Sequence, residues 1–319
     1  MSLPVVAVLK RKYPDCKLSV LALDSISDVW RGCSDIETVL SAPRKHTLSS
    51  LSKTGQLIKS DGFDAGILLT NSLPTALEFK FGKIPLISGY GYGIRTLLLS
   101  HPVVPPVSVP DMRTYYLKLV ECWEVQPEIS YPAYKVLPEW EKRCSELLSE
   151  SGISPTDRIV GMNPSGAFGT AKRWFPERYI ELGQKLIQNY GVKVLLPGTK
   201  TDYDFLDQMA TAMGPGAVNL AGKTTLGEMI ACLKKCQVFV SNDSGPMHLS
   251  ALLGVPLVAI FGSVEIKSTQ PWGLNPIRIL HQPVDCSPCL LRDCPRDHAC
   301  MDRITVDDVY QKVSELLGE

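Results

Sequence analysis

The 319-residue sequence has no excess charge of either sign, because 33 lysines and arginines balance 33 aspartates and glutamates. Domains that bind nucleic acids usually carry a basic excess or a basic stripe. The basic cluster at residues 10–12 is short, and such a cluster is typical of a solvated helix end. The sequence therefore predicts no nucleic-acid partner.

Long apolar runs are also missing. The longest clean stretch, Val255–Phe261, has the length of a strand and is far shorter than the roughly 18 residues that a membrane-spanning helix needs. Met1 leads directly into a helical pattern, without the features of a secretory signal peptide. We therefore expect a cytoplasmic protein that meets any membrane-borne substrate from the membrane surface.

Low-complexity segments and short repeats are absent as well, and the composition is ordinary for a globular protein. Hydrophobic residues make up 45% of the chain and charged residues 21%, which argues against disorder. At roughly 100–200 residues per domain, the length indicates two domains.

Short apolar segments alternate with helical patterns through most of the chain. In the second half, strands are expected at 192–196, 237–240 and 256–261, with helices around them, for example at 176–190 and 225–235. These strands are nearly uninterrupted apolar runs, which are typical of parallel sheets covered by helices on both faces.

The first half alternates in the same way but opens with a helix at residues 3–13. A doubly wound half is expected to open with a strand that becomes central to its sheet. The sequence therefore predicts an α/β protein of two doubly wound parallel-sheet domains, 1–152 and 153–319, of which the first lacks its first strand. The junction is expected in the Gly/Ser/Pro loop at 151–157, and the second domain ends with a Cys-rich loop, 286–300, and a helix.

A loop rich in small residues, 163–174 (NPSGAFGTAKRW), joins an expected strand to an expected helix. Small residues let the backbone approach a ligand closely, and Lys172 and Arg173 add two cations before the helix begins near Pro176. A strand, a small-residue loop and a helix N-terminus can together form an anion cradle. The alternative is a flexible connection with exposed cations.

A second loop, 240–248 (VSNDSGPMH), leads from a strand directly into a helix. Ser244 or Gly245 can cap that helix, and their amides can point at an anion such as a diphosphate. Asp243 is expected to organise the loop by accepting backbone N–H bonds. His248, one turn into the helix, is close enough to reach a phosphate, or else is a packed or surface residue.

Both loops follow parallel strands, whose carboxyl ends meet at one edge of the sheet, so they imply one crevice. Turns at 196–202 and 220–226 follow two further strands and complete a cleft of nucleotide size. Asp202 or Asp204 can accept hydrogen bonds from a ribose. Each is equally well explained as an acidic residue at a helix start.

The motifs at 163–174, 219–226 and 240–250, with the segments at 69–77 and 89–99, resemble those of the heptosyltransferases of glycosyltransferase family 9. The resemblance extends over nearly the whole chain. It implies a GT-B fold, in which two Rossmann-like domains face a central cleft. It further implies that the C-terminal half binds ADP-heptose and the N-terminal half the lipopolysaccharide inner core (Kdo/heptose-lipid A). We expect a monomer in peripheral contact with the inner face of the inner membrane.

Carried over by position, the resemblance implies a donor-side and an acceptor-side set of substrate-binding residues. Lys172 would neutralise the diphosphate, and Lys223 and Thr224 would lie by the adenosine. The reaction would invert the anomeric centre, and cations and helix N-termini would stabilise the leaving group, so no cofactor is required for the chemistry. The implied residues are Ser165, Lys172, Lys223, Thr224, Asp243, Ser244, Gly245 and His248 for the donor, and Asn71 and Ser72 for the acceptor.

The family's general base is an aspartate in a Gly-Asp loop, which would precede Ser2 and lie upstream of Met1. No residue here matches it, so no catalytic residue is assigned. Two explanations stay open: a sequence that begins too late, and a natural loss of activity that would leave a nucleotide-sugar-binding protein. A GT-B transferase for another nucleotide sugar is a further alternative. A second departure is Leu73-Pro74, where the family often has a basic residue.

Four cysteines cluster near the C-terminus in the pattern Cys286-x2-Cys289-x4-Cys294-x5-Cys300, with His298 nearby. Four thiolates so close in sequence can hold a structural zinc ion tetrahedrally. A redox-sensitive disulfide pair and free thiols are the alternatives. The alternative hypothesis from a different functional class is therefore a zinc-dependent or redox-regulatory protein.

Overall fold

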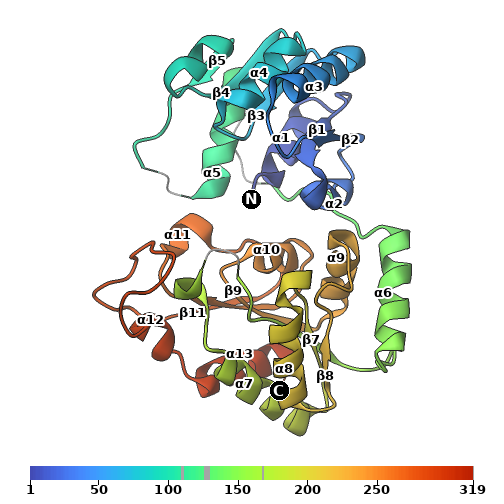
Figure 1. Ribbon diagram of the computed structural model, residues 1–319, viewed down its shortest axis with the longest axis vertical. Coiled ribbons are helices and arrows are strands. Elements are labelled where there is room, and N and C mark those ends of the chain that lie inside the picture. The colour runs from blue at the N-terminus through green and yellow to red at the C-terminus, as the bar shows by residue number, and fades with distance from the viewer. Residues whose placement is uncertain (109–110, 126–129, 167–168, 319) are drawn as a thin grey trace. The chain divides into compact units, whose positions relative to one another are not determined.

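The computed structural model describes residues 1–108, 111–125, 130–166 and 169–318. The chain forms two compact units, Met1–Lys135 and Val136–Glu319. Both consist of short parallel strands that alternate with helices, as the sequence predicts (Figure 1). In the described part of the chain, no helix combines the length and the apolar character needed to span a bilayer.

The strands of the first unit pair in two separate parallel sheets, β1-β2 and β3-β4-β5. Its elements are, in chain order, α1 (Leu3–Lys12), β1 (Ser19–Leu23), η1 (Asp24–Ile26), α2 (Ser27–Arg31), β2 (Thr38–Ala42), α3 (Leu48–Asp61), β3 (Ala65–Leu68), α4 (Leu73–Phe81), β4 (Leu86–Tyr90), η2 (Gly93–Leu98), β5 (His101–Val103), α5 (Met112–Leu117) and η3 (Lys118–Trp123).

The opening helix α1 lies in the core of this unit. Every residue from Leu3 to Leu9 is buried, and Val5 and Val8 pack with Leu117 and Val120. A helix that is apolar on every side is stable only when neighbours cover every side. The chain thus opens with a helix, as predicted. The pairing in two sheets, among the described residues, differs from the single sheet that the sequence predicts for this half.

The second unit contains one larger sheet. Its elements are α6 (Pro138–Glu150), β6 (Ile159–Asn163), η4 (Thr170–Lys172), α7 (Pro176–Tyr190), β7 (Lys193–Leu196), η5 (Lys200–Asp202), α8 (Tyr203–Met213), β8 (Ala217–Asn219), α9 (Leu226–Lys235), β9 (Val238–Asn242), α10 (Gly245–Leu252), β10 (Leu257–Phe261), α11 (Ile266–Thr269), β11 (Ile277–His281), α12 (Ala299–Asp302) and α13 (Val306–Leu317).

This six-stranded parallel sheet has the order β11-β10-β9-β6-β7-β8. The chain runs outward from β6 to β8 on one side and from β9 to β11 on the other, so the strand order reverses between β6 and β9. In open α/β sheets, ligands bind outside the carboxyl ends of the strands at such a reversal. The loops 163–174 and 240–248 lie at the carboxyl ends of β6 and β9. The topology therefore places both predicted anion-binding loops at the reversal of the strand order.

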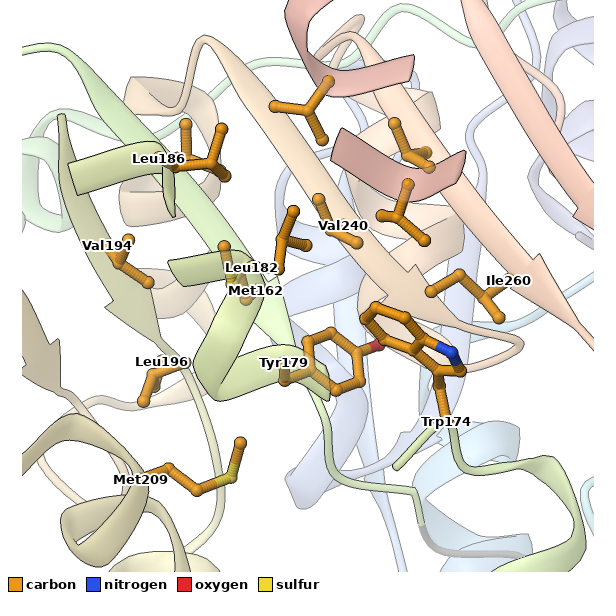
Figure 2. Packing of buried hydrophobic residues seen from close by; sticks show 14 of the residues in the cluster. Met162, Trp174, Tyr179, Leu182, Leu186, Val194, Leu196, Met209, Val240 and Ile260 are labelled. Carbon is orange, nitrogen blue, oxygen red and sulfur yellow. The ribbon is translucent and has the colours of Figure 1, made fainter. Parts of the chain in front are cut away.

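Helices cover both faces of this sheet, with α7, α8 and α13 on one face and α9 and α10 on the other (Figure 1). Figure 2 shows Trp174 beside Tyr179, a residue of α7, among the buried hydrophobic side chains of this unit. Both side chains are fully buried, and their ring centroids lie 5.0 Å apart. Nε1 of Trp174 donates a hydrogen bond to the carbonyl of Ile304 at 2.9 Å. The end of the loop 163–174 is therefore anchored in the core.

Helix α6 lies in the second compact unit, which begins at Val136, earlier in the chain than the predicted domain boundary after residue 152. Its apolar residues, among them Trp140 and Cys144, are buried, and α6 packs beside α9 (Figure 1). A Cβ atom at Gly227 of α9 would collide with the indole of Trp140, so the close approach requires glycine there. The Gly/Ser/Pro loop at 151–157 separates α6 from β6, rather than one unit from the other.

Replacement of Trp140 with Ala is expected to destabilise the second unit by about 3–5 kcal/mol, because it removes a large buried side chain between α6 and α9. Chemical unfolding followed by circular dichroism measures the change. Lys142→Ala, at an exposed position of the same helix, is the matched control and should shift the free energy of unfolding by no more than about 0.5 kcal/mol. Equal shifts for the two variants would contradict the packing of α6 on α9.

Candidate functional site

Lys172 and Asp243 meet where the strand order reverses. Lys172 ends η4, and its Nζ lies 2.6 Å from Oδ2 of Asp243, which directly follows β9. The two side chains are 18% and 6% exposed, so dissolved salt screens the pair little. The sequence predicts that Asp243 accepts backbone N–H bonds, whereas the structure shows its Oδ2 paired with Lys172. Of the loop 163–174, Ala167 and Phe168 lie outside the described residues.

The N-terminus of α10 lies in the same place. Ser244 is its N-cap and Pro246 stands in its first turn, as predicted, but the Ser244 side chain makes no capping bond. Its Oγ instead accepts a hydrogen bond from Asn163 Nδ2 at 3.0 Å and lies 2.9 Å from Ser241 Oγ. The first amides of a helix lack intrahelical acceptors and carry the positive end of the helix dipole. This helix start is therefore suited to an anion.

Three further residues of the predicted donor set belong to α10 or follow β6. Gly245 is the first residue of α10 and is exposed. His248 lies one turn into α10, with its N–H donating to the Ser244 carbonyl at 3.4 Å. Ser165 follows β6 and is buried, and its Oγ has no hydrogen-bond partner among the described residues. A buried hydroxyl without a partner is uncommon in folded proteins.

Two asparagines that the sequence-based prediction did not assign to the site hold its two loops together. Asn163 and Asn242 end β6 and β9 and are almost fully buried. Asn242 Nδ2 donates to the Pro164 carbonyl at 3.2 Å. Its Oδ1 accepts from the Trp174 N–H at 3.0 Å and from the Tyr179 hydroxyl at 3.2 Å. The sequence feature that could have identified these two asparagines is a polar residue at the end of each otherwise apolar strand.

Lys223 and Thr224 lie apart from this group. They follow β8, and β6 and β7 stand between β8 and β9 in the sheet. Lys223 is exposed, its Nζ lies 6.0 Å from the ring centroid of Tyr203, and it lines an open hollow of about 560 Å³ with Asp207. Thr224 lines a small apolar cavity under α9. Their predicted place beside an adenosine stays a prediction.

Asn71 and Ser72 belong to the first unit and join β3 to α4. Asn71 is exposed, and its Nδ2 donates to the hydroxyl of Tyr115 at 2.7 Å. Ser72 is the N-cap of α4, and its Oγ accepts from the N–H of Thr75 at 3.4 Å. Ser72 therefore has a structural task at the helix start, while the role of both residues toward an acceptor stays a prediction.

Arg95 is a buried cation beside this loop. It is 2% exposed, its Nη2 donates to the Thr70 carbonyl at 2.8 Å, and its Nη1 donates to the Tyr90 carbonyl. Its Nε has no partner among the described residues, and burial lowers the pKa of Arg95. The guanidinium thus ties together the loops that follow β3 and β4. The segment 89–99 was part of the predicted resemblance, but Arg95 was not assigned a role.

All ten cysteines are free thiols in the structure. Burial raises the pKa of Cys300, and the nearby Cys286, Cys289 and Cys294 raise it further. Among the described residues, however, no three His, Cys, Asp or Glu side chains are grouped so as to hold a metal ion. Structural zinc therefore stays a prediction, which metal analysis of the reduced protein tests.

Known proteins resemble this chain in sequence and in structure. The sequence model of glycosyltransferase family 9 (heptosyltransferase) matches residues 51–300. Lipooligosaccharide heptosyltransferase 2 of Campylobacter jejuni is 31% identical over an alignment that covers 90% of this chain and 96% of that protein. The protein of the same name from Haemophilus influenzae is 27% identical, over 98% of this chain and 93% of its own length.

Among solved structures, E. coli ADP-heptose lps heptosyltransferase II matches with a TM-score of 0.85 and 24% identity, covering 99% of this chain and 94% of that chain. At this identity the match shows the fold, which is GT-B. The family model extends over most of the chain, including both loops at the reversal of the second sheet. The chain therefore belongs to glycosyltransferase family 9, the heptosyltransferases, and is a transferase.

Proposed function

We propose that this protein is an inverting glycosyltransferase that moves heptose from ADP-heptose to the inner core of lipopolysaccharide. The observation that carries the proposal is the meeting of Lys172 with the N-terminus of α10 where the strand order reverses. A lysine and helix amides together suit a diphosphate. The printed names of its relatives, which include lipooligosaccharide heptosyltransferases, support the choice of sugar and acceptor.

In the proposed reaction, an acceptor hydroxyl attacks the anomeric carbon of the heptose as the bond from that carbon to the diphosphate oxygen breaks. Negative charge then develops on the departing ADP. Lys172 and the first amides of α10 stabilise that charge, and they are already in place before the reaction starts. Asp243 holds the Lys172 ammonium group at the end of β9. The attacking hydroxyl gives its proton to a general base, which is not assigned to any residue of this chain.

Asn71 and Ser72 are proposed as acceptor contacts, and Ser165, Lys223, Thr224, Gly245 and His248 as further donor contacts. The proposed acceptor is a membrane lipid, so we propose that the protein works in peripheral contact with the cytoplasmic face of the inner membrane. We further propose that it works as a monomer. The proposed chemistry places no demand on a cofactor, because protein cations and amides stabilise the leaving group.

A panel of nucleotide sugars tests this function. The purified full chain is titrated with ADP-heptose, ADP-glucose and UDP-glucose by calorimetry, and ADP release is then followed with heptosyl-Kdo-lipid A as acceptor. We expect ADP-heptose to bind most tightly and to be consumed only when the acceptor is present. Preference for a uridine nucleotide would contradict the proposed donor. Binding of ADP-heptose without turnover would instead favour the non-catalytic alternative.

A further inference from the structure

The cysteine-rich segment (residues 286–300) is in direct contact with the lysine loop (residues 169–174). The N–H and the Oγ1 of Thr170 both donate to Oδ1 of Asp293, at 3.2 and 3.0 Å. The N–H of Ala171 donates to the carbonyl of Arg292 at 3.1 Å. A Cβ atom at Gly169, whose φ is +133°, would collide with that same carbonyl. The backbone of the lysine loop is therefore fitted to residues 292–293.

The same segment is also attached to the loop that follows β10. Ser287 Oγ donates to the carbonyl of Gly262 at 2.6 Å, and the N–H of Leu290 donates to the carbonyl of Ser263 at 2.9 Å. The segment thus connects two loops at the carboxyl edge of the sheet, and one of them carries Lys172. The cysteines themselves make none of these contacts.

The contacts between Thr170 and Asp293 lie at the surface. Thr170 and Asp293 are both exposed, and the hydrogen bonds from the Thr170 backbone and side chain hold the pKa of Asp293 below its ordinary value. Because both residues are exposed, they are not part of the core, and their hydrogen bonds add little to the free energy of unfolding. Thr170 stands two residues before Lys172, so its hydrogen bonds to Asp293 fix the lysine loop close to that lysine.

We propose that Asp293 is a positioning residue for the donor site: through Thr170 it holds the lysine loop in the conformation that presents Lys172 to the diphosphate. The proposal rests on the proposed function of Lys172 and extends it to the cysteine-rich segment, which then serves donor binding as well as local structure. Asp293 itself touches no substrate. Its acceptor oxygen, rather than its charge, is the feature that matters.

Calorimetric titration of the full chain with ADP tests this role. We expect Asp293→Ala to weaken ADP binding about fivefold, because the lysine loop loses the acceptor of two hydrogen bonds, and their exposure to water limits the effect. Asp293→Asn keeps the acceptor oxygen and should bind within about twofold of the parent, and Thr170→Ser should do so as well. Thr170→Val loses the hydroxyl donor and should weaken binding, but the double variant Thr170→Val/Asp293→Ala should be no weaker than Asp293→Ala alone.

Asp297→Ala is the matched control, because Asp297 is an exposed acid in the same segment whose Oδ1 accepts from the nearby Ala299 N–H. Its ADP affinity should equal that of the parent, and its unfolding midpoint should equal that of Asp293→Ala. Full ADP affinity in Asp293→Ala overturns the proposal, as does an unfolding midpoint well below that of the control. If the parent binds ADP but Lys172→Ala does so equally well, the proposed function of Lys172 fails first.

Discussion

Replacement of Lys172 with Ala is expected to weaken the binding of ADP about 10- to 100-fold. Charge-assisted hydrogen bonds contribute about 1.5–3 kcal/mol, and each 1.4 kcal/mol is a factor of ten in affinity. The Lys172 side chain is 18% exposed, so water replaces its contact with a diphosphate poorly. Calorimetric titration with ADP measures the loss. Lys172→Arg keeps the charge and should retain part of the affinity.

Two controls separate the ligand contact from protein stability. Lys172→Ala leaves the carboxylate of Asp243, which is only 6% exposed, without its partner, and breaking a buried pair is costly. The double variant Lys172→Ala/Asp243→Asn removes both charges, so it should recover stability and still bind ADP weakly. Lys185→Ala removes a lysine that pairs with the exposed Asp307 and should leave ADP binding unchanged. Parent-like affinity in Lys172→Ala would remove Lys172 from the site.

Asn242→Ala is expected to destabilise the second unit by about 3 kcal/mol or more. The variant leaves the N–H of Trp174 and the carbonyl of Pro164 without the partners that Asn242 provides. Each buried polar group left without a partner costs about 1–3 kcal/mol. Urea unfolding of the purified chain measures the change in free energy, with the slope checked for constancy.

Asn189→Ala is the matched control for this prediction. Asn189 is an exposed asparagine whose Nδ2 donates to the Tyr310 hydroxyl at 2.8 Å, so its loss should change stability by no more than about 0.5 kcal/mol. A second expectation follows from the place of Asn242 between the two loops: its variant should also bind ADP less well at temperatures where it is folded. Equal unfolding free energies for the two variants would mean that Asn242 does not hold the loops.

Most helices and strands were predictable because apolar runs and helical spacing are local signals. The exceptions have local causes. Strand β5 contains Pro102, which is tolerated because β5 lies at the edge of its sheet. Strand β11 is partly exposed along its length and lacks the uninterrupted apolar pattern of the buried strands. Helix α6 lies with the second unit because Trp140 packs against Gly227, and no local signal indicates a contact between residues so far apart in sequence.

The centre of the site was predictable as well, because Lys172 and Ser244 stand in loops that end parallel strands. The partners of these residues were not. The bond of Lys172 to Asp243 spans 71 residues, and that of Thr170 to Asp293 spans 123. No pattern in a single sequence indicates pairings at such separations.

Asp202 shows the opposite case. Its Oδ2 accepts from the Thr199 N–H at 2.8 Å, which is the ordinary task of an acidic residue at a helix start. The structure thus accounts for Asp202 without a ribose. The sequence alone could not separate a ribose contact from a helix-start residue, because both favour an acidic residue at this position.

A crystal structure of the full chain with ADP tests the central claim most directly. The diphosphate should lie within hydrogen-bond distance of Lys172 Nζ and of the first amides of α10, beside the ends of β6 and β9. A diphosphate bound elsewhere on the second unit, with Lys172 turned only toward Asp243, would contradict the account.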